Sequence, residues 1–218
     1  MWILSTFKRQ PLAQRFLDSL QGAAPGRVLV DGGDPYDGLQ LPPGWTYDYY
    51  PDNIGYLPRC NQVFFENPNE PWYGIGGDDI VVPPQPGWDK RLIDAAGPLG
   101  FSNCSDSGYK DHEPFPTGVH IFGGDLVRAM GFIAVPGCRH TYADDAWMNL
   151  FAAFPGLRVT CNDIRIEHLH VNRGLAVNDE AHQKAYAFVR QDYEAWGTIR
   201  ATGEWDRAME RVRIARGG

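Results

Sequence analysis

Two adjacent carboxylates near the middle of the chain, Asp78 and Asp79, follow an apolar segment and two glycines, Gly76 and Gly77. In open α/β sheets, ligands bind beyond the carboxyl ends of the strands, so carboxylates placed there meet a ligand or a metal ion. The glycines permit close approach of a ligand to the backbone. A solvated turn is the alternative, because Gly and Asp are also common in turns.

A second group of candidate ligands, His168 and His170, lies at the end of a predicted strand. Side chains alternate across a strand, so both imidazoles share one face and could converge on one cation. Together with the acid pair they make a mixed carboxylate and imidazole set, which suits Mn²⁺ better than Ca²⁺ and tolerates Mg²⁺. Either both histidines or only one of them would be a metal ligand.

A third acidic pair, Asp144 and Asp145, opens a predicted amphipathic helix. The helix N-terminus stabilises the carboxylate form of such residues. An ionised carboxylate on a rigid element can accept a proton from an attacking hydroxyl, which makes either residue a candidate general base. A plain helix cap is the alternative, which would use one Asp and leave the other free.

The hydrophobic pattern predicts the strands and helices that position these residues. A strand at 2–7, a helix from Pro11 to Leu20 and a strand at 27–30 suggest a right-handed βαβ unit with a parallel pair. Asp125 is expected to cap a short helix at 126–130. Further strands are expected at 72–77, 80–82, 157–161 and 164–170, and further helices at 88–96, 144–154 and about 179–196.

Two long stretches are expected to be mostly loop. Residues 35–71 are rich in Pro, Gly, Asp and Tyr, although Gln62–Phe65 could end a helix or form a strand. Residues 98–120 are polar and contain glycine, which is typical of a mobile lid or an acceptor-binding loop.

Composition limits the class of protein. The chain has 218 residues, 43% of them apolar, which is enough for one domain or one domain with an extension and excludes a disordered chain. A net charge of −7 argues against a general phosphate-binding surface. No apolar run approaches the roughly 20 residues of a membrane-spanning helix, and the start of the chain lacks the features of a secretory signal. These features predict a cytoplasmic protein with free cysteines at positions Cys60, Cys104, Cys138 and Cys161.

The last 21 residues, 198–218, carry five arginines and a helical stripe of Trp205, Met209 and Val212. The stripe could simply dock on the rest of the chain, or it could tether the protein to a membrane surface, a partner or a DNA acceptor. The predicted organisation is therefore a catalytic domain at 1–197 and a basic helical extension at 198–218.

Taken in order, these pieces resemble a nucleotide-sugar glycosyltransferase of the GT-A type, near the inverting family 2 and its short phage-encoded members. The resemblance covers roughly residues 2–195 and implies an α/β fold, with a mixed, mostly parallel sheet flanked by helices in a single domain. The motifs that carry it are Ser5-Thr6-Phe7-Lys8-Arg9, Val28-Leu29-Val30-Asp31, Arg59-Cys60-Asn61, Asp78-Asp79, Phe122-Gly123-Gly124-Asp125 and Asp144-Asp145.

The resemblance also implies roles for these residues. Asp79 is similar to the metal ligand that ends the family's acid motif. His168 or His170 is similar to the metal-binding histidine that the family has near the end of the domain. Asp144 stands where the family usually has Glu, so that either it or Asp145 would be the base. The nucleotide would be bound by Thr6, Asp31, Arg59, Asn61 and Asp78.

The activity implied by the resemblance is metal-dependent transfer of a sugar from a nucleoside diphosphate, a UDP-sugar by family likeness, to a hydroxyl with inversion. The acceptor could be a glycan, a protein or a modified DNA base, and a phage-encoded protein would act in the host cytoplasm. Mn²⁺ or Mg²⁺ would neutralise the leaving diphosphate. The alternatives are a metal-dependent sugar-phosphate nucleotidyltransferase and a non-catalytic nucleotide- or sugar-binding protein.

Overall fold

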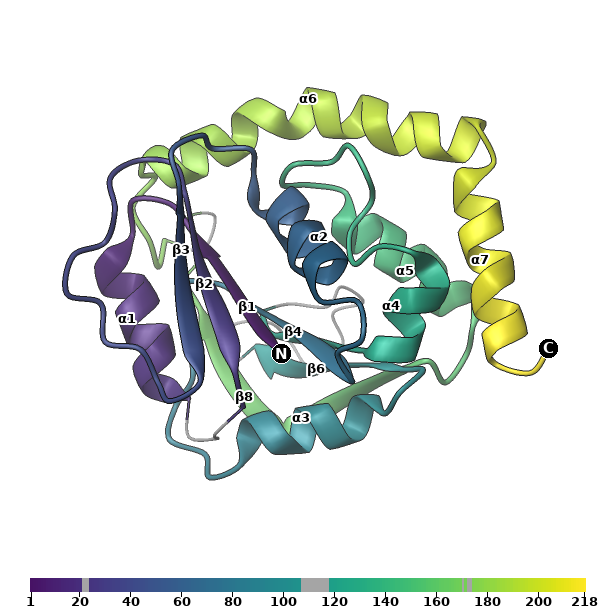
Figure 1. Cartoon of the computed structure of the whole chain (residues 1–218), viewed down its shortest axis with the longest axis horizontal. Helices are drawn as coiled ribbons and strands as arrows, with labels where there is room; N and C mark the ends of the chain where they lie inside the picture. Colours follow the sequence, from purple (N-terminus) through teal and green to yellow (C-terminus); the bar gives the residue numbers. More distant parts are fainter. Residues whose placement is uncertain (21–23, 107–117, 170, 172–173) are drawn as a thin grey trace.

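The computed structural model describes residues 1–20, 24–106, 118–169, 171 and 174–218. These residues form one eight-stranded sheet in the order β3-β2-β1-β4-β7-β6-β8-β5, with helices around it (Figure 1). The pairs β1–β2, β2–β3, β1–β4 and β6–β8 are parallel, and the remaining pairs are antiparallel. The mixed, mostly parallel α/β sheet implied by the resemblance is confirmed.

The strands are β1 (Trp2–Thr6), β2 (Gly26–Asp31), β3 (Trp45–Tyr50), β4 (Trp72–Gly76), β5 (Ile80–Val81), β6 (Phe101–Asp106), β7 (His120–Gly123) and β8 (Arg158–His168). The helices are α1 (Gln10–Ser19), α2 (Tyr56–Glu66), α3 (Trp88–Ala96), α4 (Gly124–Met130), α5 (Ala143–Ala153), α6 (Glu180–Ala201) and α7 (Glu204–Ala215).

The predicted βαβ unit is present as β1, α1 and β2. β1 is an apolar, mostly buried strand that pairs in parallel with β2, and Pro11 occupies the first turn of α1. α1 packs closely on the sheet because β4 ends in glycine. A Cβ at Gly76 would lie 2.2 Å from the ring of Phe16, so only glycine fits there without displacing α1.

The prediction of mostly loop at 35–71 was wrong over β3 and α2, which this stretch contains. β3 is an edge strand whose six residues are mostly aromatic and only partly buried, so that its apolar residues do not alternate cleanly. α2 includes Pro58 in its first turn, where proline is tolerated. In the sequence alone, proline is usually taken as a residue that ends a helix. Gln62–Phe65 belongs to α2, so the helical alternative for that segment is confirmed.

The prediction of a polar loop at 98–120 was also wrong over β6 and the first residue of β7, while residues 107–117 lie outside the described part. β6 is buried although its sequence is polar, because its side chains find partners. Ser102 Oγ donates to the carbonyl of Leu92 at 2.6 Å, and Asn103 Oδ1 accepts from Arg158 Nε at 3.0 Å. Satisfied polar groups can be buried without the apolar signature of a strand.

The two strands expected at 157–161 and 164–170 form a single strand, β8. Its pairing with β6 shifts register between Cys104 and Ser105, which accommodates the polar step in the middle of β8 without ending the strand. The cap expected at Asp125 was wrong as well, since Gly123 is the N-cap residue and Asp125 lies in the first turn of α4. The four cysteines are free, as predicted.

The C-terminal helix α7 packs against α4 and the rest of the core. Trp205 and Val212 are buried, and the guanidinium of Arg211 donates to the carbonyls of Ala129 and Met130. The expected boundary at 197 and 198 falls inside α6, which continues to Ala201 because buried residues recur past that point. None of the helices in the described ranges has the length and apolar character required to cross a membrane.

Candidate active site

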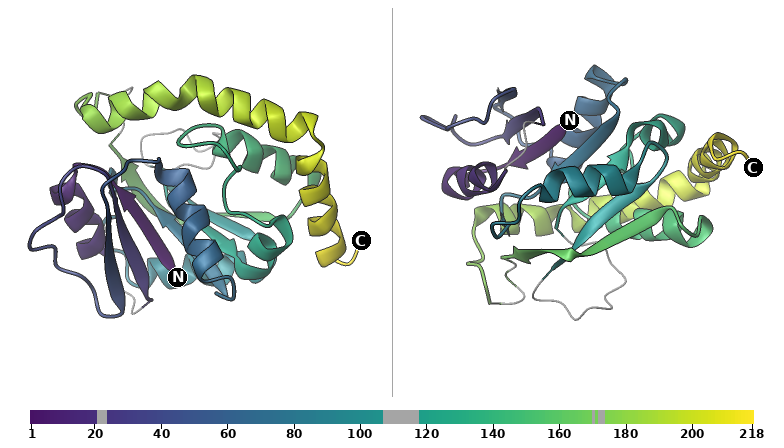
Figure 2. Two further views of the ribbon diagram at one scale, coloured as in Figure 1. Left: turned by 45° about the horizontal axis from the view of Figure 1, so that its top comes forward. Right: turned by 90° about the horizontal axis from the view of Figure 1, so that it is seen from below.

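A cleft of about 590 Å³ opens at the carboxyl ends of β1, β2 and β4. The first half of α6 runs across this edge of the sheet and forms one wall, while the start of α5 forms another (Figures 1 and 2). A cleft beyond the carboxyl ends of parallel strands is where open α/β sheets bind their ligands. Its lining includes Thr6, Arg9, Asp31, Asp78, Asp79, His120, His140, Asp144, Asp145, His168, His182 and Lys184.

Asp79 and His168 are brought together by strand pairing. β5 begins directly after Asp79 and pairs antiparallel with the end of β8, where Ile80 faces His168 and the Leu169 N–H donates to the Asp79 carbonyl at 2.9 Å. This register places His168 Nε2 3.3 Å from Asp79 Oδ2. Burial would raise the pKa of Asp79, but the hydrogen bond and charge of His168, together with Arg9, hold it below its usual value.

These two atoms fit the donor set of a divalent cation. Two neighbouring ligands on an octahedral ion lie about 3 Å apart, given metal–ligand distances of roughly 2.1 Å. Among the described residues, no three His, Cys, Asp or Glu side chains form a cluster able to hold a metal alone. Magnesium and similar ions are usually bound by one or two protein ligands together with substrate phosphates, so a pair of ligands suits a site that a diphosphate completes. His170 lies outside the described residues.

Asp106 lies behind His168, with its Oδ2 4.0 Å from His168 Nδ1 and its side chain fully buried. This distance is that of an electrostatic contact and is too long for a hydrogen bond. A carboxylate hydrogen-bonded to the far nitrogen of a metal-binding imidazole would fix the ring orientation and tautomer. The polar residues of β6 therefore include a candidate support for the metal-binding atom of His168, which the sequence interpretation missed because it treated this segment as loop.

Asp78 is buried beside β1 rather than directed at His168. Its Oδ2 accepts from Thr6 Oγ1 at 2.7 Å, and its Oδ1 lies 3.1 Å from Arg9 Nη1. Burial, and then the charge of Asp79, raise the pKa of Asp78 to about 6. The two adjacent carboxylates thus differ in environment, which leaves Asp79 as the more strongly charged member of the pair.

Arg9 links the cleft to the N-terminus of α6. Its guanidinium makes two hydrogen bonds of 2.7 Å to Asp179, the N-cap of α6, and contacts His182 Nδ1 at 2.6 Å. Lys8 forms a second ion pair with Glu180 at 2.8 Å. The turn after β1 and the start of α6 are therefore held together across the mouth of the cleft.

Asp31 lines the cleft at the end of β2 and is held by the start of α2. Its carboxylate accepts from the Gly55 N–H at 2.7 Å, the Ile54 N–H at 3.2 Å and Arg59 Nε at 2.7 Å. Arg59 therefore acts on the cleft through Asp31. The side chain of Asn61 points elsewhere, bonding the backbone of residues 133 and 134. Neither Arg59 nor Asn61 lines the cleft.

Asp144 and Asp145 form the first turn of α5 and open into the cleft. Tyr142, the residue before the helix, is the N-cap and has a φ of 64°, which costs a non-glycine residue about 1–2 kcal/mol. The side chain of Asp144 reaches solvent through the cleft while protein surrounds it on the other sides. That burial, and then the charge of Asp145, raise the pKa of Asp144 to about 6.

Two further imidazoles line the cleft, and burial favours the neutral form of each. Burial lowers the pKa of His120 to about 3, and burial also lowers that of His140. His120 packs against Trp147 with the ring centroids 5.1 Å apart, and His140 packs against Tyr56 at 5.5 Å. These residues add polar atoms to the cleft without adding positive charge.

The cleft brings together most of the residues singled out in the sequence, namely Thr6, Asp31, Asp78, Asp79, Asp144, Asp145 and His168. The sequence interpretation missed Arg9, His120, His140, His182 and Lys184 as lining residues. Of these residues only Arg9 could have been found from the sequence, because it is the last residue of the motif Ser5-Thr6-Phe7-Lys8-Arg9. The others come from α6, from the loop before α5 and from β7, and no spacing rule connects them.

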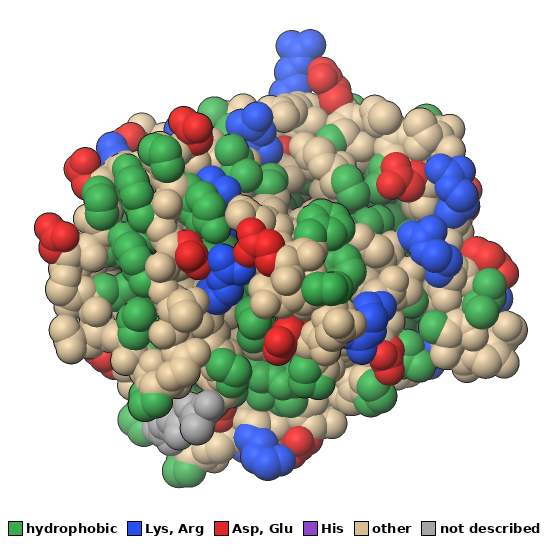
Figure 3. All heavy atoms as spheres, viewed as in Figure 1, with side chains coloured by type: hydrophobic (Ala, Val, Ile, Leu, Met, Phe, Trp, Pro, Cys, Tyr) green, Lys and Arg blue, Asp and Glu red, His purple; other side chains and the backbone are tan. Residues whose placement is uncertain are grey.

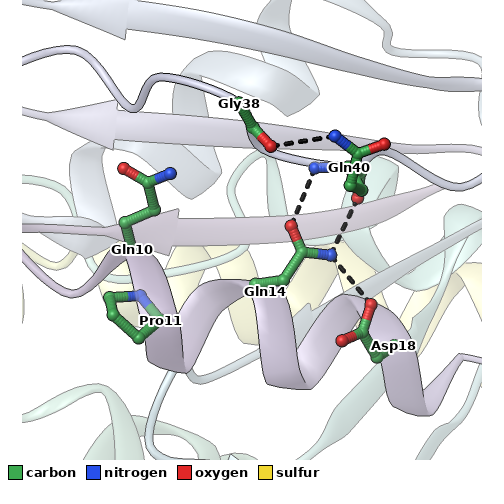
Figure 4. Close-up of a pocket in the computed structure, with 6 residues that line it drawn as sticks. All are labelled: Gln10, Pro11, Gln14, Asp18, Gly38 and Gln40. Atoms are coloured by element: carbon green, nitrogen blue, oxygen red, sulfur yellow. Dashed lines mark hydrogen bonds between the residues drawn. The ribbon is translucent and has the colours of Figure 1, made fainter.

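A second hollow, of about 410 Å³, lies between α1 and the loop around residue 40 (Figure 4). Gln14 Nε2 donates to the Gln40 carbonyl at 3.0 Å, and Gln14 Oε1 accepts from the Gln40 N–H at 2.7 Å. Gln40 Nε2 donates to the Gly38 carbonyl at 3.0 Å. These amides are engaged in holding the loop on α1, so we assign no ligand to this hollow.

The distribution of charged side chains on the surface is consistent with the net charge of −7. On the face shown in Figure 3, basic and acidic side chains are interspersed and form no continuous basic area. This distribution gives no sign on that face of a general nucleic-acid-binding surface.

No protein-family model and no curated protein sequence matches the chain. Among solved structures it is similar to TarS of S. aureus, with 12% identity and a TM-score of 0.56 over 83% of this chain, which spans only 40% of that TarS chain. It is also similar to TarS 1-349 in complex with UDP, with 13% identity and a TM-score of 0.58 over 98% of this chain and 82% of that one.

A third similar structure is GalNAc-T7 with UDP, GalNAc and Mn²⁺, with 8% identity and a TM-score of 0.53 over 78% of this chain and 43% of that one. At these identities the likeness establishes the fold, while the nearness to family 2 and its phage-encoded members stays a prediction. The chain therefore has the GT-A fold of nucleotide-sugar glycosyltransferases.

Proposed function

We propose that the protein is a metal-dependent glycosyltransferase that transfers a sugar from a UDP-sugar to a hydroxyl acceptor with inversion. The observation that carries this proposal is the 3.3 Å approach of His168 Nε2 to Asp79 Oδ2 in a cleft that also contains Asp144. TarS solved with UDP and GalNAc-T7 solved with UDP and Mn²⁺ share the fold, which supports the same class of donor.

The preference for uridine is supported by the chemistry of Asp31. A carboxylate only accepts hydrogen bonds. Asp31 lines the cleft, and hydrogen bonds from the Gly55 N–H and Arg59 Nε orient its two oxygens. Uracil presents an imide N–H to such an acceptor, whereas cytosine presents a ring nitrogen that itself accepts. A carboxylate placed at this ring position therefore favours uracil, whereas cytosine could donate to it only from its neighbouring amino group.

The diphosphate would lie beside Asp79 and His168. A divalent cation held by these two side chains would offset the negative charge that develops on the diphosphate as the sugar leaves. Because Asp78 and Asp79 alone would repel a diphosphate, we expect nucleotide binding as well as turnover to depend on the metal.

Asp144 is the general base in this proposal. Its carboxylate accepts the proton of the acceptor hydroxyl, whose oxygen bonds to the anomeric carbon while the bond from that carbon to the diphosphate oxygen breaks. A direct displacement of this kind inverts the anomeric centre. The raised pKa of Asp144, about 6, lies close to neutral pH, where a general base is most effective.

The pH dependence of turnover should reveal this group. Asp144 must be deprotonated to accept a proton, so kcat should rise with pH through about 6 and level off above it. Asp145→Asn removes the neighbouring negative charge that helps to raise this pKa, so its kcat profile should rise at a lower pH. Initial rates between pH 4.5 and 8.5 test this expectation, and an unshifted profile in the variant would contradict it.

Lys184 is a candidate partner of the diphosphate. It lines the cleft, its Nζ lies 5.5 Å from the ring centre of Phe7, and no carboxylate of the described residues forms an ion pair with it. Lys184→Ala should weaken UDP binding in the presence of Mn²⁺ by roughly tenfold, about 1.4 kcal/mol. Calorimetry measures this change, with Lys90→Ala on the distant helix α3 as the control. Equal UDP affinity in Lys184→Ala and the wild type would remove Lys184 from the site.

The proposed function itself is tested by incubating the protein with a panel of nucleotide sugars, with and without Mn²⁺, and measuring released nucleoside diphosphate. We expect UDP release from at least one UDP-sugar, only with the metal. Pyrophosphate release from a sugar phosphate and a nucleoside triphosphate would instead indicate a nucleotidyltransferase. Metal-dependent UDP binding without any release would indicate a binding protein.

A further inference from the structure

Asp192, in the middle of α6, is a fully buried carboxylate outside the cleft, with 0% of its surface exposed. Its neighbours in the chain, Gln191 and Tyr193, are both exposed. A buried carboxylate is costly unless its oxygens are satisfied by hydrogen bonds. The partners of Asp192 therefore indicate what it does.

All four partners of this carboxylate come from one short segment, residues 139–141. Oδ1 accepts from the Arg139 N–H at 2.7 Å, and Oδ2 accepts from the N–H groups of His140 at 2.8 Å and Thr141 at 2.7 Å. Thr141 Oγ1 donates a further bond to Oδ2 at 3.0 Å. Three consecutive backbone N–H groups thus converge on one side chain, which fixes the direction of the chain at this point.

The segment is fixed on its other side by α2. The Arg139 carbonyl accepts from the Leu57 N–H at 3.2 Å, and it packs so tightly that a Cβ at Gly55 would lie 2.5 Å from it. Gly55 has a φ of 99° and donates its N–H to Asp31. The same segment therefore joins α6 to the part of the cleft that surrounds Asp31.

Residues 139–141 lead directly into the first turn of α5. Tyr142 follows with its left-handed φ of 64°, and its carbonyl accepts from the Ala146 N–H at 3.2 Å, so the path of this segment determines where α5 begins. Asp144 lies in that first turn and opens into the cleft. A small displacement of the segment would move Asp144 relative to Asp79 and His168, which lie on other elements.

We propose that Asp192 is a positioning residue, which holds residues 139–141 so that Asp144 meets the acceptor hydroxyl at the correct distance and angle. This inference rests on the proposed function for the role of Asp144. Asp192 makes no contact with substrate in this account. Its effect should appear in the rate of transfer more than in the binding of the donor. Asp79 and His168 belong to other elements, and the Asp31 carboxylate is also held by the Ile54 N–H and by Arg59, which lie outside residues 139–141.

The test uses Asp192→Asn, which keeps the size of the side chain. In its best orientation the amide oxygen retains the bonds from His140 and Thr141, and the amide NH2 then faces the Arg139 N–H, so that segment must shift. Misplacement of a catalytic group by about 1 Å can cost on the order of 100-fold in rate, so we expect kcat to fall by about 10- to 100-fold. The donor KM and the affinity for UDP with Mn²⁺ should stay within about twofold of the wild-type values, because the contacts that bind the donor in its ground state are retained.

The matched control is Asp89→Asn, which converts another buried carboxylate into an amide. Asp89 is 2% exposed, accepts from the Lys90 N–H at 2.8 Å, and lies on α3, on the far side of the sheet from α6 (Figure 1). Its kcat should remain within about twofold of the wild type, because distant sites act independently. Rates are expressed per UDP-binding site measured by calorimetry, so that loss of folded protein is not read as loss of turnover.

Hydrogen–deuterium exchange gives a readout that does not depend on activity. Asp192→Asn should speed amide exchange in residues 139–145 and leave that of α3 unchanged. Thr141→Val removes only the hydroxyl bond, should fold normally and should lower kcat a few-fold, which provides a second variant should Asp192→Asn fail to fold.

Equal kcat per binding site in Asp192→Asn and wild type, or unchanged exchange in 139–145, would overturn the inference. If Asp192→Asn does not fold, wild-type kcat in Thr141→Val would overturn it. Should the wild type release no UDP from any donor, the proposed function fails by itself, and exchange in residues 139–145 still decides whether Asp192 holds the segment.

Discussion

Asp144→Asn is expected to lower kcat by about 1,000-fold, within the range of effects found for general bases. The asparagine side chain has the same shape but cannot take a proton from the acceptor hydroxyl. UDP affinity in the presence of Mn²⁺ should stay close to that of the wild type, because the residues proposed to bind the donor lie outside α5, at the ends of β2 and β8, between β4 and β5, and on α6. Steady-state rates and calorimetry on the same preparations measure both quantities.

Asp145→Asn is the matched control for this prediction. It changes the neighbouring carboxylate in the same turn of α5 by the same substitution, and both residues line the cleft. We expect it to retain most of kcat at pH 8 and to differ from the wild type mainly in the pH at which kcat rises. A large loss in Asp145→Asn together with normal turnover in Asp144→Asn would assign the base to Asp145 instead.

Asp79→Asn is expected to abolish the effect of Mn²⁺ on UDP binding and to lower kcat/KM by at least about 100-fold, since a metal ion supplies several kcal/mol of charge stabilisation. The neutral amide is a weaker ligand than a carboxylate. The fold should survive, because the pairing of β5 with β8 uses the Asp79 carbonyl and not its side chain. Titrations of UDP with and without Mn²⁺ measure the loss.

Asp78→Asn provides the comparison within the same motif. Asp78 bonds Thr6 and Arg9, and its raised pKa of about 6 makes it the less charged member of the pair. We expect its UDP affinity to fall by only about tenfold, with the dependence on Mn²⁺ retained. The account of the metal site would be wrong if Asp78→Asn lost the metal effect while Asp79→Asn kept it.

The sequence was sufficient to predict those parts of the fold in which a periodic pattern coincides with burial. β1, α1 and β2 follow from short apolar runs with a proline in the first helical turn. β6 could not be predicted in this way, because Ser102 and Asn103 are buried through hydrogen bonds to residues that are distant in sequence or on other elements. β3 is an edge strand whose aromatic side chains are only partly buried.

The residues of the candidate site likewise include some that the sequence could predict and some that it could not. Asp79 and His168 could be paired from the sequence because each ends or adjoins a strand whose face is set by alternation. The sequence could not reveal the roles of three other residues, Asp106, Asp192 and Lys184. These roles depend on the packing of β6 and α6 against segments far away in the chain. Asn61 was expected near the nucleotide from its motif, yet its amide is used to hold residues 133 and 134.

The position of the cation tests the central claim most directly. Crystals grown with UDP and Mn²⁺ can be examined for anomalous scattering from manganese. The account predicts one strong peak in the cleft, at about 2.0–2.2 Å from Asp79 Oδ2 and from His168 Nε2, with the diphosphate completing its ligands. Bound UDP with no manganese at these two atoms, or with manganese elsewhere in the molecule, would contradict it.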